Sequence, residues 1–196
     1  MSDLSEFEVY LRTAAPPLSG LRPFVCEGSP LNCQVALVGY NPATSLSADF
    51  WDFWDAESGF DKERWFETYK QERAAEPLKE GRTRRRQISM TRQRIELFLN
   101  GLDTSCLETN LYWDASPDRA SRPPTGDGPF GELLQRCPNL RLIVCHDPRA
   151  FEQTKRLGLD ARTERVDHFA NRKKGWGNAA ALALGKEMKV ILDQSN

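Results

Sequence analysis

Apolar residues gather in short runs along this chain, and the runs are separated by amphipathic or polar stretches. Residues 34–39 (Gln-Val-Ala-Leu-Val-Gly) are too few for a free-standing helix and are typical of a buried strand. The pattern predicts further strands at 106–111, 141–145 and 159–166, the last with less regular alternation. It predicts helices at 6–13, 62–76, 87–99, 148–157 and 178–193.

Strands that alternate with helices indicate a parallel sheet with helices on both faces. The sequence therefore predicts an α/β fold, a three-layer αβα sandwich around a central, mainly parallel four-stranded sheet. The 196 residues contain no repeat, low-complexity segment or dividing linker, so one domain is expected over 1–196. Residues 55–86 are expected to form a helical insertion in it.

Ligands of open parallel sheets bind at the carboxyl ends of the strands. Three segments that follow predicted strands carry a polar side chain suited to a site: Asn41, Asn110 and His168. An asparagine offers both a donor and an acceptor, as reading an amide-like base edge requires, and a histidine can donate to an oxygen that becomes anionic. Gly39 allows a sharp turn and a close approach, while Pro42 stiffens the loop.

Structural roles compete with these assignments. Asn41 before Pro42 is also common turn chemistry, and an asparagine at a strand end often caps backbone groups. Cys145-His146 invites a Cys–His dyad, which we reject because neighbours at a strand end point to opposite sides. The aromatic residues at 50–54 are typical of core packing, although one of them can still face a pocket.

Composition narrows the chemistry. The 27 basic and 28 acidic residues exclude a disordered polyanion and a histone-like polycation but leave nucleic acid open as a partner. Five cysteines without a CxxC pair predict core residues, no metal site and no cofactor. No apolar stretch is long enough to cross a bilayer, and the acidic start lacks signal-peptide features, so we expect a cytoplasmic monomer without a membrane partner.

Local charge favours contact with nucleic acid over a merely solvated face. Arg84, Arg85 and Arg86 belong to a stretch that has no acidic residue between Arg82 and Arg94, and arginine binds phosphate in bidentate fashion. A second basic region surrounds His168 and contains Arg162, Arg165, Arg172, Lys173 and Lys174.

Three short patches resemble the uracil-DNA glycosylase superfamily. Residues 35–42 (Val-Ala-Leu-Val-Gly-Tyr-Asn-Pro) are similar to its first motif, in the Gly-x-Asn-Pro form of the mismatch-specific and single-strand-selective branches. Thr109-Asn110-Leu111 resembles the segment with the base-reading asparagine. His168, followed by Lys-Lys-Gly-Trp at 173–176, resembles the second motif and the segment that leads into the final helix.

The resemblance implies a role for each matching residue. Asn41 would position the attacking water and His168 would stabilise the departing base, while Asn110 would read the base. The remaining roles would be a pocket lined by Gly39, Tyr40 and Pro42, a stacking aromatic at Phe50 or Phe53, and a DNA-contacting loop with Arg172, Lys173, Lys174 and Trp176. The chain departs from the family where Phe169-Ala170 replaces Pro-Ser and where Ala43 replaces a glycine.

We therefore expect a DNA glycosylase that hydrolyses the N-glycosidic bond of uracil or a related damaged base in single- or double-stranded DNA. No carboxylate is evident as a general base, which predicts a slow enzyme. The alternative is a non-catalytic nucleic-acid-binding protein on the same fold. An unrelated α/β hydrolase or nucleotide-binding domain is disfavoured, because GxSxG, GxGxxG and P-loop patterns are absent from the sequence.

Overall fold

The computed structural model describes residues 3–42, 46–78, 80–81, 83–115, 129–171 and 176–194. The strands are β1 (Phe24–Val25), β2 (Val35–Gly39), β3 (Trp54–Asp55), β4 (Gly59–Phe60), β5 (Cys106–Asn110), β6 (Leu142–Cys145) and β7 (Arg162–Arg165). The α-helices are α1 (Leu4–Ala14), α2 (Lys62–Ala75), α3 (Met90–Leu102), α4 (Pro129–Gln135), α5 (Pro148–Arg156) and α6 (Asn178–Gln194). The 3-10 helices are η1 (Pro30–Asn32) and η2 (Phe50–Phe53).

The main sheet has five strands in the order β1-β5-β2-β6-β7. The four predicted strands are β2, β5, β6 and β7, and they run parallel to one another. The prediction of four strands is wrong because β1 adds an antiparallel fifth at the edge beside β5. Two residues are too few to form a recognisable hydrophobic pattern. β3 and β4 form a separate antiparallel hairpin, which the sequence pattern also did not indicate.

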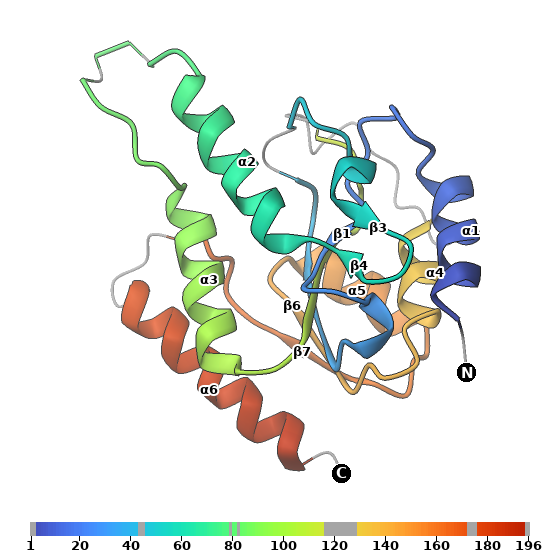
Figure 1. The fold of residues 1–196 in the computed structure, drawn as a ribbon. Coiled ribbons are helices and arrows are strands. Elements are labelled where there is room, and N and C mark those ends of the chain that lie inside the picture. Colours follow the sequence, from blue (N-terminus) through green and yellow to red (C-terminus); the bar gives the residue numbers. More distant parts are fainter. Residues whose placement is uncertain are drawn as a thin grey trace.

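Helices cover both faces of the sheet, which confirms the α/β layered architecture (Figure 1). Alternate residues of β2 point to opposite faces: Val35 and Leu37 pack with α3 and α6, whereas Ala36 and Val38 pack in the core with α1, α4 and α5. The core on the α1, α4 and α5 face is rich in aromatic rings, which include Phe50 and Phe53 of η2. Figure 1 shows α3 and α6 side by side on one face, with α2 leading away from the sheet before the chain returns along α3.

Local capping fixes the position of α3. The predicted helix at 87–99 begins at Met90, because the Ser89 hydroxyl accepts a hydrogen bond from the Arg92 N–H and caps the helix. The helix ends at Leu102, and its C-cap Asp103 adopts a left-handed conformation with φ 47°. The N-terminal end of α3 lies beside β5, because Arg92 contacts Glu108 at 2.6 Å.

The strand order contains a switch point at β2. The chain places β5 on one side of β2 and then β6 on its other side, so the connections diverge there. Open α/β sheets bind ligands in the crevice outside the carboxyl ends of the strands at such a point. Among the described residues, no helix has the length and apolar character needed to cross a bilayer.

Candidate functional site

Three neighbouring strands bring polar residues to one level of the sheet. Gly39 at the end of β2 pairs with Asn110 at the end of β5. Val38 pairs with Cys145, so His146 follows β6 one residue further along. Because side chains alternate along a strand, Gly39, Asn110 and His146 all belong to the sheet face that carries α3 and α6.

Gly39 leaves the space in which the other two side chains meet. A Cβ atom at this position would lie 2.6 Å from Asn110 Oδ1 and 2.8 Å from His146 Nε2. Both distances are well below ordinary van der Waals contact, so any side chain here would displace the amide or the imidazole. The sequence predicted that Gly39 permits close approach, and the approaching groups include two side chains of the protein itself.

A cavity of about 230 Å³ lies above these residues. Its walls come from β1, β2 and β5, from α2 and α3, and from the segments before β1 and after β2, β6 and β7. The lining residues are Arg22, Val25, Leu37, Asn41, Trp65, Tyr69, Ser89, Thr91, Arg92, Ile95, Glu108, Thr109, Asn110, His146, His168 and Ala170. The structure thus brings Asn41, Asn110 and His168 together. The volume equals that of about eight waters at ~30 Å³ each, below the roughly 300–1,000 Å³ of sites for drug-sized ligands.

The loop that carries His168 is held from three sides. Arg94 of α3 donates to the backbone oxygens of Phe169 and Asn171, both at 2.7 Å. Trp176 donates from Nε1 to the His168 oxygen at 3.0 Å. Phe169 is fully buried and packs edge-on against Phe98 at a centroid distance of 5.4 Å. Packing and hydrogen bonds therefore hold this loop in place.

The hydrogen bonding of His168 determines which ring nitrogen carries the proton. Nδ1 accepts from the Ala170 backbone N–H at 3.0 Å. A neutral imidazole has one donor and one acceptor nitrogen, so Nε2–H is the donor of the half-buried ring. His168 lines the cavity, and donation from Nε2 to a ligand is the role that this tautomer permits.

His146 is a site residue that our sequence interpretation missed. Its ring meets that of His168 edge-to-face at a centroid distance of 4.9 Å, and that of Phe169 at 5.3 Å. The sequence signal that could have identified His146 is its position directly after a predicted strand. Cys145 lies on the opposite sheet face, where its Sγ contacts Thr154 Oγ1 at 3.6 Å. This confirms that Cys145 and His146 form no dyad.

The aromatic wall of the cavity comes from α2. Trp65 and Tyr69 lie one turn apart with nearly parallel rings, 5.9 Å between centroids. The Tyr69 hydroxyl accepts from the Ser89 N–H at 3.2 Å, which orients the ring. Phe50 and Phe53, predicted to stack on a base, instead pack in the aromatic core and line a separate cavity of about 30 Å³ with Pro42. Their sequence position after the first motif did not reveal which way they point.

Tyr40 turns away from the cavity. Its ring is buried and contacts Tyr112 edge-on at 5.1 Å, and its hydroxyl accepts from Arg149 at 3.1 Å. Its side chain thus supports the end of β2 from the opposite sheet face, as alternation after Gly39 requires.

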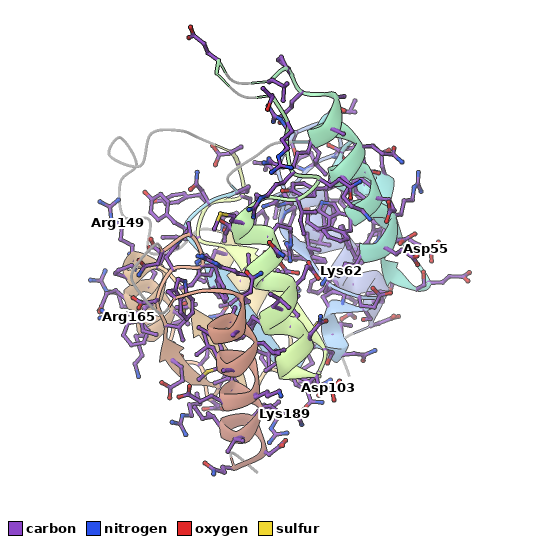
Figure 2. All side chains as sticks on the ribbon, turned by 90° about the vertical axis from the view of Figure 1, so that its left-hand side faces the viewer. Asp55, Lys62, Asp103, Arg149, Arg165 and Lys189 are labelled. Carbon is purple, nitrogen blue, oxygen red and sulfur yellow. The ribbon has the colours of Figure 1, made fainter. Side chains whose placement is uncertain are left out.

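Charged residues form a network below the aromatic wall. Arg92 lies 2.6 Å from both Glu96 and Glu108, and Lys62 lies 3.4 and 3.3 Å from the same two carboxylates. Burial opposes ionisation of Glu108, but the charges of Arg92 and Lys62 outweigh it and hold the Glu108 pKa below its ordinary value. The carboxylate is therefore ionised at neutral pH. Lys62 is seen between α2 and α3 in Figure 2.

The predicted nucleic-acid contacts are dispersed. Arg84 and Arg86 are exposed in the connection between α2 and α3, whereas Arg85 pairs with Glu76. Arg172, Lys173 and Lys174 lie outside the described residues. Trp176 is half-buried, its ring packs near Phe169 at 6.0 Å, and it supports the His168 loop.

Within the described part of the chain, no group of three or more His, Cys, Asp or Glu side chains is arranged to hold a metal ion. The chain matches no protein-family model, and a search of curated proteins found no significant relative.

Proposed function

We propose that the protein is a DNA glycosylase that hydrolyses the N-glycosidic bond of uracil or a related deaminated base. The observation that carries the proposal is the convergence of Asn41, Asn110, His146 and His168 on one cavity. They come from the carboxyl ends of four parallel strands around the switch point, where α/β sheets bind ligands.

The cavity suits a single flipped base. Its volume of about 230 Å³ accommodates one heterocycle, and Trp65 and Tyr69 offer an aromatic wall for it. Asn110 supplies an amide donor and acceptor for the polar edge of the base. An aromatic wall and one amide explain binding of a planar heterocycle without a metal or a cofactor.

Hydrolysis requires a water, a leaving base and a donor for the charge that develops on it. Asn41 orients the water, whose oxygen forms a bond with the sugar C1′ as the C1′–N bond breaks. The bonding electrons leave with the base, and the proton of the water passes to solvent. His168 Nε2–H donates to the base oxygen that becomes anionic, an interaction that strengthens in the transition state.

The second candidate is a binding protein without hydrolysis. It is favoured by Phe169, which is fully buried where the family resemblance implies a proline and a phosphate-binding serine beside it. In that case DNA would bind and the base would remain attached.

Base release under single-turnover conditions separates the two candidates. The enzyme, in excess, is incubated with oligonucleotides that contain uracil, hypoxanthine or xanthine. We expect abasic product from the wild type and about 100-fold less from Asn41→Ala and from His168→Ala. Asn100→Ala, an exposed residue of α3, is the matched control. Tight DNA binding without product from any of the three bases would overturn hydrolysis and support the binding protein.

A further inference from the structure

Arg22 brings a positive charge to the cavity. It precedes β1 and lines the cavity together with Trp65, over whose ring its guanidinium carbon lies 5.8 Å from the centroid. Its backbone N–H donates to the Trp113 oxygen. Across the described ranges, its guanidinium makes no hydrogen bond or ion pair. Arg22 is half-buried, and charged groups withdrawn from water normally have such partners, so this guanidinium is a candidate ligand contact.

The neighbouring charges do not neutralise Arg22. Arg92 and Lys62 are each paired with both Glu96 and Glu108, so these four charges cancel. The charge of Arg22 is therefore in excess. Burial and the charge of Arg92 lower the Arg22 pKa to about 10. The guanidinium stays protonated at neutral pH, so an anion bound in the cavity would balance its charge.

Further donors surround the same end of the cavity. Trp65 is 2% exposed, and its indole N–H has no hydrogen-bond acceptor within the described segments. Ser89 and Thr91 line the cavity at the N-terminal end of α3, where backbone N–H groups and the helix dipole favour negative charge. An anion here would accept from the guanidinium and the indole together.

We propose that Arg22, Trp65 and the N-terminal end of α3 form an anion subsite that binds the phosphate of the nucleotide whose base occupies the cavity. The base lies against Asn110 and His168 at the sheet edge, and the phosphate lies toward α3. This proposal rests on the proposed function for the identity of the base. The phosphate belongs either to a DNA strand or to a free mononucleotide.

Direct binding tests the subsite without requiring catalysis. The affinities of deoxyuridine, deoxyinosine and deoxyxanthosine are compared with those of their 5′-monophosphates by calorimetry. We expect the monophosphate of at least one pair to bind at least about 10-fold more tightly than its nucleoside. Arg22→Gln should abolish this preference, and Arg22→Lys should retain part of it. Arg136→Gln, at an exposed residue directly after α4, should leave the preference unchanged. No preference in any pair, or an unchanged preference in Arg22→Gln, overturns the subsite.

Modified oligonucleotides identify the source of the phosphate. An oligonucleotide with a single uncleavable 2′-fluoro-deoxyuridine is prepared with a normal or a neutral methylphosphonate linkage 5′ to that nucleotide. If the phosphate is that of DNA, the neutral linkage weakens binding about 10-fold in the wild type and not in Arg22→Gln. Equal binding of both oligonucleotides, with the mononucleotide preference intact, assigns the subsite to a free nucleotide. Failure of base release with either result refutes the glycosylase and leaves the subsite established.

Discussion

Gly39 occupies the point at which the side chains of Asn110 and His146 meet, so the site depends on the absence of its Cβ. We predict that Gly39→Ala shifts the amide or the imidazole, costs about 1–3 kcal/mol of unfolding free energy, and sharply lowers base release. Calorimetric or denaturant unfolding gives the first value and single-turnover kinetics the second. Gly177→Ala is the matched control, because a Cβ there meets nothing within 4 Å. Base release at the wild-type rate in Gly39→Ala would show that these two side chains do not form the site.

The residues of the site were predictable to different degrees. Asn41 and Asn110 follow directly from the rule that ligands bind where parallel strands end, and the cavity contains both. His146 obeys the same rule, but its cysteine neighbour directed attention to a dyad. Arg22 could not be found, because it precedes a two-residue strand and reaches the cavity only through tertiary packing. Phe50 and Phe53 have the right chemistry for stacking, but local sequence does not specify the face to which a loop residue points.

At the scale of elements, Arg94 connects α3 to the loop between β7 and α6. It is 5% exposed and donates to two backbone oxygens of that loop. We predict that Arg94→Met, which keeps the apolar stem, destabilises the protein by about 2 kcal/mol because one buried and one partly buried carbonyl lose their donor. Hydrogen exchange should accelerate in 167–171 more than in α6, and base release should fall. Arg136→Met is the control, and unchanged exchange in 167–171 would contradict the anchoring role.

Glu108 of β5 ties the sheet to α3 and to the start of α2 through Arg92 and Lys62. Its pKa lies below the ordinary 4.5, so its stabilising contribution is fully present above that pH and is lost as the pH falls through the folded-state value. We predict that Glu108→Gln lowers the unfolding free energy by about 3 kcal/mol at pH 7, because Arg92 loses a charged partner. The difference from the wild type should shrink below about pH 4.5. Glu67→Gln, which removes a surface pair with Lys70, should change stability by less than about 1 kcal/mol at any of these pH values. A pH-independent difference for Glu108→Gln would contradict the ion-pair explanation.

The elements themselves were largely predictable. The four parallel strands were recognised from short apolar or partly alternating runs, and five of the helices from longer amphipathic or apolar segments. β1 and the seven-residue α4 were missed because they are short and stabilised by their neighbours. The cavity also depends on α2, which supplies Trp65 and Tyr69. The position of α2 against the sheet is set by tertiary packing, which the local sequence pattern does not reveal.

At the scale of the whole molecule, the proposed DNA contacts within the described residues are dispersed. Arg84 and Arg86 lie in the connection between α2 and α3, while Arg149 and Arg165 lie together on another side of the molecule (Figure 2). We predict that the double substitution Arg84→Gln, Arg86→Gln reduces the slope of log K against log salt concentration by about 1.4–1.8, as expected for two phosphate contacts. Fluorescence anisotropy with labelled oligonucleotides measures it.

Lys189→Gln provides the control for that experiment. Lys189 pairs with Asp193 on α6, far from the connection between α2 and α3 (Figure 2). Its substitution should leave the slope unchanged. An unchanged slope in the double arginine variant would remove that connection from the DNA-binding surface.

In the proposed function, one cavity at the sheet edge binds a base between the residues that act on it. The chain contains two histidines, and both line this cavity. In protein labelled with ¹⁵N only at histidine, NMR therefore reports the site from His146 and His168 alone. We predict that free uracil, hypoxanthine or xanthine shifts both imidazoles with a single saturation curve, and that His168 carries its proton on Nε2 before ligand is added. If neither imidazole shifts with any of these bases, while DNA still binds, the cavity is not the base-binding site.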